Sequence, residues 1–244
     1  MDWIFRAVLT AVTVFLVVQA ARRIGQRAAG VIAALPIITA PALVWVSHEH
    51  GVGFAVHAAV GSVSARAIMA GFAIAYARGT RLGNVATALA FGLAGAVAIA
   101  LPAALAIDRL AQALALAIVC CSVAMVSLPG GRNRVASPRQ SGSAAVAVAL
   151  ASGGLAAWAA TIGPELGGFA TGLMSSLPLI GSGVAILEHK KSGPRAAAQF
   201  RHGYLRGLFG KMAFGAVFAW LAVPVGTPSA LLVGIAVAGV LSTR

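Results

Sequence analysis

The chain is a succession of long apolar runs separated by short clusters of basic residues. A helix needs about 20 apolar residues to cross the hydrocarbon core of a bilayer. Charged residues make up only 9% of the 244 residues, and the mean hydropathy is +0.94. A soluble domain has about 25% charged residues, so this chain has too few to cover a water-facing surface. The sequence therefore predicts an all-α, polytopic membrane helical bundle.

The charge balance and the cysteines exclude other classes of protein. Lys and Arg number 18 against 5 Asp and Glu, which gives a net charge of +13. A basic chain binds nucleic acid through a soluble basic face, and this chain has none, so we expect no nucleic-acid partner. Cys120 and Cys121 are neighbours inside an apolar run and indicate neither a disulfide framework nor a metal site. We expect no cofactor.

Charged and turn-forming residues divide the chain into nine predicted spans. They cover residues 4–21, 28–47, 53–77, 84–106, 110–128, 143–161, 166–187, 195–221 and 227–242. A signal peptide is the alternative for the first span. We expect a first membrane repeat with an extra linking helix at 1–128, a cytoplasmic linker at 129–142, and a second, inverted repeat at 143–244.

Basic residues concentrate in alternate loops. The basic loops contain Arg22, Arg23 and Arg27, then Arg78 and Arg81, then Arg132, Arg134 and Arg139, and finally Lys190, Lys191 and Arg195. The intervening loops hold Glu49 between two histidines, Asp108 beside Arg109, and Glu165. Because cytoplasmic loops are rich in Lys and Arg, we expect the N-terminus outside and the C-terminus in the cytoplasm.

Part of the sequence is repeated. Residues 30–51 align with residues 172–193 without a gap, at an offset of 142 (172 minus 30). The identical pairs are Gly30 and Gly172, Leu35 and Leu177, Pro36 and Pro178, Ile38 and Ile180, and Gly51 and Gly193. Five spans precede the second copy, so the copies cross the membrane in opposite directions. Inverted repeats are typical of secondary transporters, with the substrate at the midplane, although channels and scaffolding proteins also contain them.

Residues 28–59, AAGVIAALPIITAPALVWVSHEHGVGFAVHAA, resemble the conserved part of the GlpM-like small inner-membrane proteins. The resemblance covers about 40 residues here and is weaker in the second copy. It implies a multi-pass protein of the bacterial inner (plasma) membrane with a role in envelope polysaccharide or lipid physiology. It supplies no catalytic residues. This chain departs from that family by its duplication and by the arginines inside its third and eighth spans.

Pro36 and Pro178 lie near the middle of the second and seventh spans. Proline removes a backbone donor and kinks or breaks a helix. A second weak point follows each one, at Pro41 and at the Gly-Ser-Gly around Ser182, so we expect a short unwound segment in each span. The half-helix that starts there directs free N–H groups at the midplane and favours an anion, with Thr39 and Ser182 beside it. A packing kink is the alternative.

Arg66 and Arg206 fall close to mid-bilayer, where an arginine costs about 2.5–3.5 kcal/mol on insertion scales. All the acidic residues lie near the membrane interfaces, so an anionic ligand is a better partner for these arginines than an internal salt bridge. Pairing to exposed helix-end carbonyls is the alternative. Ser62, one turn before Arg66, is a candidate hydrogen-bonding companion.

The eighth span also contains further basic residues. An ideal helix places Arg195, His202 and Arg206 within about 40° of one another, as a cationic stripe from the cytoplasmic mouth. Arg201 and Lys211 are expected to project elsewhere, with Lys211 reaching the outer face by snorkelling.

Acidic and imidazole side chains end the second and seventh spans. Glu49 with His48, and Glu188 with His189, could exchange protons at opposite mouths during transport. Wetted helix ends are the more ordinary interpretation. The His-Glu-His run lacks the i, i+4 spacing of a helical zinc site, so we expect no metal.

These patterns predict a secondary-type transporter or flippase for an anionic solute or a phosphate-bearing lipid. Its partners would be that anion, the membrane lipids and, compatibly with the chain length, a second copy in a homodimer. No serine elbow, phosphate-binding loop or pair of mid-membrane carboxylates supports an enzyme, so we expect none. The alternative is a non-transporting scaffold or accessory protein for envelope polysaccharide or lipid export.

Overall fold

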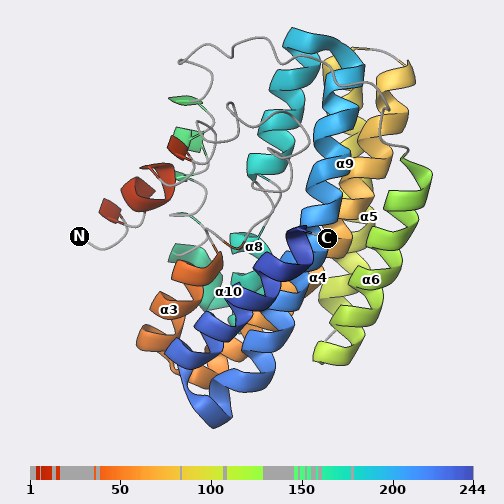
Figure 1. Ribbon diagram of the computed structural model, residues 1–244. Coiled ribbons are helices and arrows are strands. Elements are labelled where there is room, and N and C mark those ends of the chain that lie inside the picture. Colours follow the sequence, from red (N-terminus) through yellow and green to blue (C-terminus); the bar gives the residue numbers. More distant parts are fainter. Residues whose placement is uncertain are drawn as a thin grey trace.

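The computed structural model describes a helical bundle (Figure 1). The described residues are 4–5, 7–12, 15–16, 36, 39–82, 84–106, 109–128, 146–147, 149–151, 153–154, 158, 161–176 and 179–243. Their named elements are α3 (Thr39–His50), α4 (Val52–Leu82), α5 (Val85–Ala106), α6 (Leu110–Ser127), η1 (Gly163–Leu166), α8 (Gly168–Ser175), α9 (Leu179–Val225) and α10 (Thr227–Thr243). The predicted spans 4–21 and 143–161 lie largely outside the described residues, and the linker 129–142 lies wholly outside them.

Four helical segments are long and apolar enough to cross a membrane. They are Val52–Leu82, Val85–Ala104, Leu110–Ser127 and Arg201–Val225, and α10 is a shorter apolar helix. Their outward faces expose large apolar side chains, such as Leu101 on α5, Val126 on α6 and Leu232 on α10. Apolar surface of this extent is stable against lipid tails rather than water. The all-helical prediction is confirmed for these residues, and the apolar helices indicate association with a membrane.

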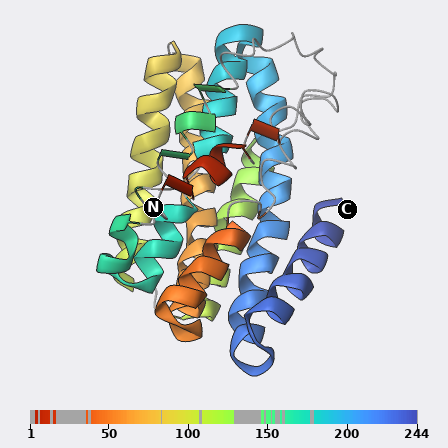
Figure 2. The same cartoon turned by 90° about the vertical axis from the view of Figure 1, so that its left-hand side faces the viewer.

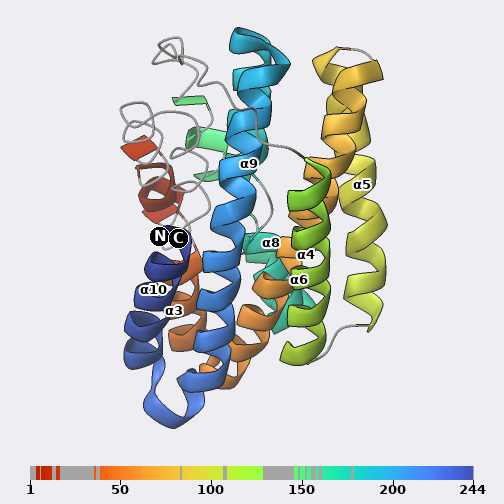
Figure 3. The same cartoon turned by 45° about the vertical axis from the view of Figure 1, so that its right-hand side comes forward.

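Helix α4 lies at the centre of the bundle, in contact with α3, α5, α6, α8 and α9 (Figures 2 and 3). Small residues on its surface allow the neighbouring backbones to approach closely. A Cβ atom added at Gly61 would collide with the Phe169 carbonyl of α8, and one added at Gly71 would collide with Ile99 of α5. The apolar helix is therefore shielded by protein along most of its length.

Helix α9 bends sharply. The contacts of Tyr76 show this, because they join it to two residues that a straight helix would hold far apart. The Tyr76 hydroxyl lies 3.0 Å from His189 Nδ1, and Arg201 Cζ lies 5.5 Å from the centre of the Tyr76 ring. A straight helix would separate positions 189 and 201 by about 18 Å. Pro194 falls between them in the sequence. We call residues 179–190 the first arm of α9 and residues 201–225 its second arm, and the two arms meet at one end of the bundle (Figure 1).

The helices alternate in direction. α3 and α5 run opposite to α4, whereas the first arm of α9 and α10 run opposite to the second arm (Figures 1 and 3). The series α3–α4–α5 therefore has the reverse orientation of the series formed by the two arms and α10. Gly51 makes the turn between α3 and α4, and Gly226 makes the turn between α9 and α10. Their φ values are 86° and 83°, a left-handed conformation that suits glycine.

Two aromatic clusters occupy opposite ends of the bundle. In the Tyr76 cluster, Phe72 stacks on Tyr76 at 5.6 Å between ring centres, and both pack with Ala88. In the Phe218 cluster, Phe214 stacks on Phe218 at 6.5 Å. Ala230, Leu43 and Val46 complete the Phe218 cluster. Because α4 and the second arm are antiparallel, the two clusters lie toward opposite ends.

Two glycines of α4 test how tightly the bundle packs. We expect Gly61→Ala to lower the free energy of unfolding by about 1–3 kcal/mol, because the added methyl group meets the α8 backbone. Gly53→Ala is the matched control, since an added Cβ there has nothing within 4 Å, and we expect a change of no more than about 1 kcal/mol. Thermal unfolding of the purified protein in detergent measures both. Equal midpoints for the two variants would contradict the close α4–α8 packing.

Candidate functional site

The guanidinium of Arg66 is completely buried, with 0% of the residue exposed. Its Nε donates to the Ser62 carbonyl at 3.0 Å, and its Nη2 donates to Ser62 Oγ at 3.4 Å. Its Nη1 is buried and has no hydrogen-bond partner. The arginine is thus held against the preceding turn of its own helix, with part of its donor capacity unused. The sequence correctly paired Ser62 with Arg66.

The Ser62 hydroxyl joins Arg66 to an interruption in the neighbouring helix. Ser176 Oγ donates to Ser62 Oγ at 2.8 Å. Helix α8 ends at Ser175 and α9 begins at Leu179, so the predicted seventh span consists of two helices at this level. Pro178 itself lies outside the described residues.

Lys211, on the second arm of α9, is also buried. Only 8% of Lys211 is exposed, and its ammonium group interacts electrostatically with Arg66. Two contacts between α4 and the second arm lie on either side of Arg66 and Lys211 along the helices. Tyr204 Oη donates to Met69 Sδ at 3.0 Å, and Gly215 packs against Val63. We call Ser62, Arg66, Ser176 and Lys211 the central site.

Neither cation of the central site faces a carboxylate among the described side chains. Glu49 and Glu165, the acidic residues whose side chains are described, are both exposed. The wall toward α6 is formed by Cys121, whose thiol donates to the Arg66 carbonyl at 3.6 Å. The central site therefore places a guanidinium and a lysine amine in an interior of small hydroxyl groups and apolar side chains.

The expected position of Lys211 was wrong. Lys211 was expected to reach the outer face by snorkelling, but only 8% of it is exposed. Arg201, expected to project away from the cationic stripe, is also buried, with 8% exposed. The face of the second arm that packs on α4 is marked by Tyr204, Leu208 and Lys211, at helical spacings of four and three. Lys211 follows Tyr204 by seven positions, so the two share one helix face, and this spacing was the sequence signal for the burial of Lys211.

The predicted cationic stripe is only partly described. Arg206 is half-buried and has an interaction of its own. His202 Nδ1 lies 3.4 Å from the Leu128 carbonyl at the end of α6. The Arg195 side chain lies outside the described residues, so the stripe stays a prediction. Five positions separate Arg206 from Lys211, which places them about 140° apart around the helix.

Around the first proline, helix α3 begins at Thr39, and the Ala40 N–H donates to the Pro36 carbonyl at 2.9 Å. The Thr39 hydroxyl is buried without a partner. Of the two weak points expected in the seventh span, only the one at Pro178 lies beside an interruption, between α8 and α9, whereas residues 181–183 are helical and belong to α9. The Ser182 side chain lies outside the described residues.

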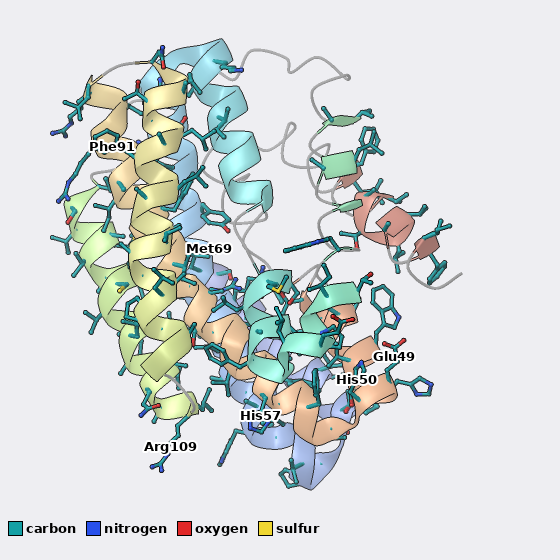
Figure 4. All side chains as sticks on the ribbon, turned by 180° about the vertical axis from the view of Figure 1, so that it is seen from behind. Glu49, His50, His57, Met69, Phe91 and Arg109 are labelled. Carbon is teal, nitrogen blue, oxygen red and sulfur yellow. The ribbon has the colours of Figure 1, made fainter. Side chains whose placement is uncertain are left out.

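The acidic and imidazole helix ends lie far from the central site. His48, Glu49 and His50 are exposed at the end of α3, as Figure 4 shows for Glu49 and His50. His189 bonds Tyr76 beyond the seventh predicted span, and burial lowers the pKa of His189, with the charge of Arg201 as a second cause. The Glu188 side chain lies outside the described residues. Their role in proton exchange stays a prediction.

Comparisons with protein-family models, curated proteins and solved structures find no match for this chain. The resemblance to the GlpM-like proteins stays a prediction, and the function is argued from the site.

Lys211→Met tests whether the central charge is retained for binding rather than stability. Methionine fills a similar volume without a charge, and it is the residue at the position 142 earlier, Met69. We expect the ligand-free variant to be more stable by about 1–3 kcal/mol, since burying a charged group is costly. Thermal unfolding in phosphate-free detergent solution measures this change. A destabilised variant would indicate that Lys211 has a structural partner.

Proposed function

We propose that this protein is a secondary-type membrane transporter or flippase that binds an anion at the central site. The observation that carries this proposal is the burial of Arg66 and Lys211 at one level, without a carboxylate among the described side chains. Two like charges in a low-dielectric interior repel each other and lose their hydration. A bound anion relieves both penalties, and the unused Arg66 Nη1 and the Ser62 and Ser176 hydroxyls are suitable donors.

The proposal includes two inverted repeats. In its support, α5 and α10 begin 142 residues apart, at Val85 and Thr227. Their first turns close in the same way, by Ala88 N–H to Asn84 O at 3.0 Å and by Ala230 N–H to Gly226 O at 3.1 Å. The offset also relates the stacked pairs of the two aromatic clusters and two glycines that face their rings. These glycines are Gly92, against Phe72, and Gly234, against Phe214.

The aromatic clusters explain how such a site would serve transport. On α4 the Tyr76 cluster lies between Arg66 and the basic end of the bundle, where Arg78, Arg81 and Lys190 are exposed. On the second arm the Phe218 cluster lies between Lys211 and the opposite end. Each cluster therefore covers one side of a fully buried site. Opening one cluster at a time would give alternating access, with the basic end in the cytoplasm.

The ligand class follows from the donors of the central site. Guanidinium, ammonium and hydroxyl groups together suit an oxyanion such as phosphate or carboxylate. A small organic anion and the phosphate of a lipid headgroup share this chemistry. We place the protein in the bacterial inner membrane on the basis of the basic loops and the family resemblance.

Arg66→Gln tests the function directly in proteoliposomes. We expect at least about a tenfold loss in uptake of radiolabelled inorganic phosphate or in flipping of a fluorescent phosphatidylglycerol, since a charge-assisted hydrogen bond contributes about 1.5–3 kcal/mol. Lys211→Met should lose a similar amount. Arg81→Gln is the matched control, because Arg81 is exposed at the end of the same helix. Unchanged rates in both Arg66→Gln and Lys211→Met would contradict anion binding at the central site. A wild type that is inactive in both assays and retains a bound partner protein would favour the scaffold function.

Labelling of single cysteines tests the proposed orientation. His50 and Lys190 are both exposed. His50 ends α3 and Lys190 ends the first arm of α9, and these two segments end at opposite ends of the bundle (Figure 1). In a background with Cys120→Ala and Cys121→Ala, we expect His50→Cys to react with an impermeant maleimide from the periplasm and Lys190→Cys only after the membrane is opened. Reaction of both from one side would contradict the arrangement.

A further inference from the structure

We propose that Arg201, Tyr76 and His189 form a second anion-binding subsite, for an oxyanion on its way between the cytoplasm and the central site. This inference rests on the proposed function and adds a second station to its pathway. The three residues come from α4 and from both arms of α9 (Figure 1). Nothing in the central site requires them, since Tyr76 lies ten positions, or about 15 Å, along α4 from Arg66.

The guanidinium of Arg201 is buried with unused donors. Only 8% of the residue is exposed, and neither Nε nor Nη1 has a hydrogen-bond partner. The Tyr76 ring, 5.5 Å from Cζ, engages the cation through its π face. The N–H groups of a guanidinium lie in its plane and form a fork that matches an oxyanion. Buried donors of this kind are normally satisfied, so a ligand is the missing acceptor.

The Tyr76–His189 pair supplies a further hydrogen-bond donor, whichever of the two residues donates in the contact between them. If the Tyr76 hydroxyl donates across the 3.0 Å contact to Nδ1, the Nε2–H of a neutral imidazole remains free. If Nδ1–H donates to the tyrosine oxygen, the hydroxyl hydrogen remains free. Arg201 is close enough to His189 for their charges to interact. One ligand atom can therefore accept from the pair while another accepts from the guanidinium.

The surroundings of the subsite indicate an anion arriving from the basic end. Arg78, Arg81 and Lys190 are exposed at this end and create a positive field that raises the local concentration of anions. Phe72 and Tyr76 lie on α4 between this surface and Arg66. An anion at the subsite contacts the aromatic cluster itself, and it bonds α4 to the two arms that must separate for the central site to open.

Calorimetric titration of the full-length protein with inorganic phosphate, in neutral detergent at low ionic strength, tests the subsite. We expect the wild type to bind two phosphates and Arg201→Gln to bind one, with affinity at the lost site reduced at least about tenfold. Arg66→Gln should lose the other site, and the double variant should bind none. Arg81→Gln, which removes a nearby but exposed charge, should retain both.

The outcomes separate this inference from the function on which it rests. Two sites in Arg201→Gln with one site in Arg66→Gln would overturn the subsite and leave the central site standing. Two sites in both variants would overturn both. If Arg201→Gln does not fold, Tyr76→Phe keeps the ring and removes the hydroxyl. A severalfold weakening of one phosphate site in Tyr76→Phe supports the subsite, and unchanged binding overturns it.

Vesicles distinguish a free anion from a lipid headgroup as the source of the oxyanion. The titration is repeated with protein in phosphatidylcholine vesicles, with and without phosphatidylglycerol. Loss of the Arg201-dependent phosphate site only when phosphatidylglycerol is present assigns the subsite to a headgroup. An unchanged site in both vesicles assigns it to a free oxyanion. Absence of the Arg201-dependent site from both vesicles, when it is present in detergent, would overturn its role in the membrane-embedded protein.

Discussion

The burial of the Arg66 guanidinium, on the central helix α4, is the constraint on which the rest of the structure depends. Arg66 cannot reach water from the middle of α4, and neighbouring helices cover the helix around it. An arginine at this depth needs protein or ligand partners. The turn before it supplies the Ser62 carbonyl and hydroxyl, and Ser176 extends this polar network to α8. Close helix packing buries Arg66, and the interruption between α8 and α9 lies beside Ser176, which bonds Ser62.

The same close packing separates the polar interior from the two ends. Glycines and alanines let α5, α6 and α8 lie closely against α4. Aromatic pairs then close the bundle above and below. Burial of Arg66 and Lys211 within this enclosure costs stability, because a charged side chain loses its hydration there. A stacked aromatic pair packed with an alanine lies toward each end of the bundle, Phe72 and Tyr76 at one end and Phe214 and Phe218 at the other.

Much of the helical layout was readable from the sequence, but its polar contacts were only partly so. The predicted spans 84–106 and 110–128 coincide closely with α5 and α6, because turn residues set their bounds, whereas α4 continues past the predicted end at 77, through Arg78 and Arg81, to Leu82. Ser62 and Arg66 were paired correctly, since both belong to one helix. Lys211 was misplaced, because the face that a helix turns inward depends on its neighbours. No sequence pattern singles out Tyr76, because its partners lie in distant parts of the chain.

The sequence by itself determined the class of structure, the main helix bounds and the presence of an arginine too deep to hydrate. These follow from local properties: the length of an apolar run, the spacing of charges and the backbone preferences of proline and glycine. Only the tertiary structure decided which cations share an enclosure. The bend in α9 brings Arg201 and His189 onto one tyrosine, and the packing of its second arm on α4 brings Lys211 near Arg66. Both depend on contacts across more than 100 positions of the chain, which no local pattern specifies.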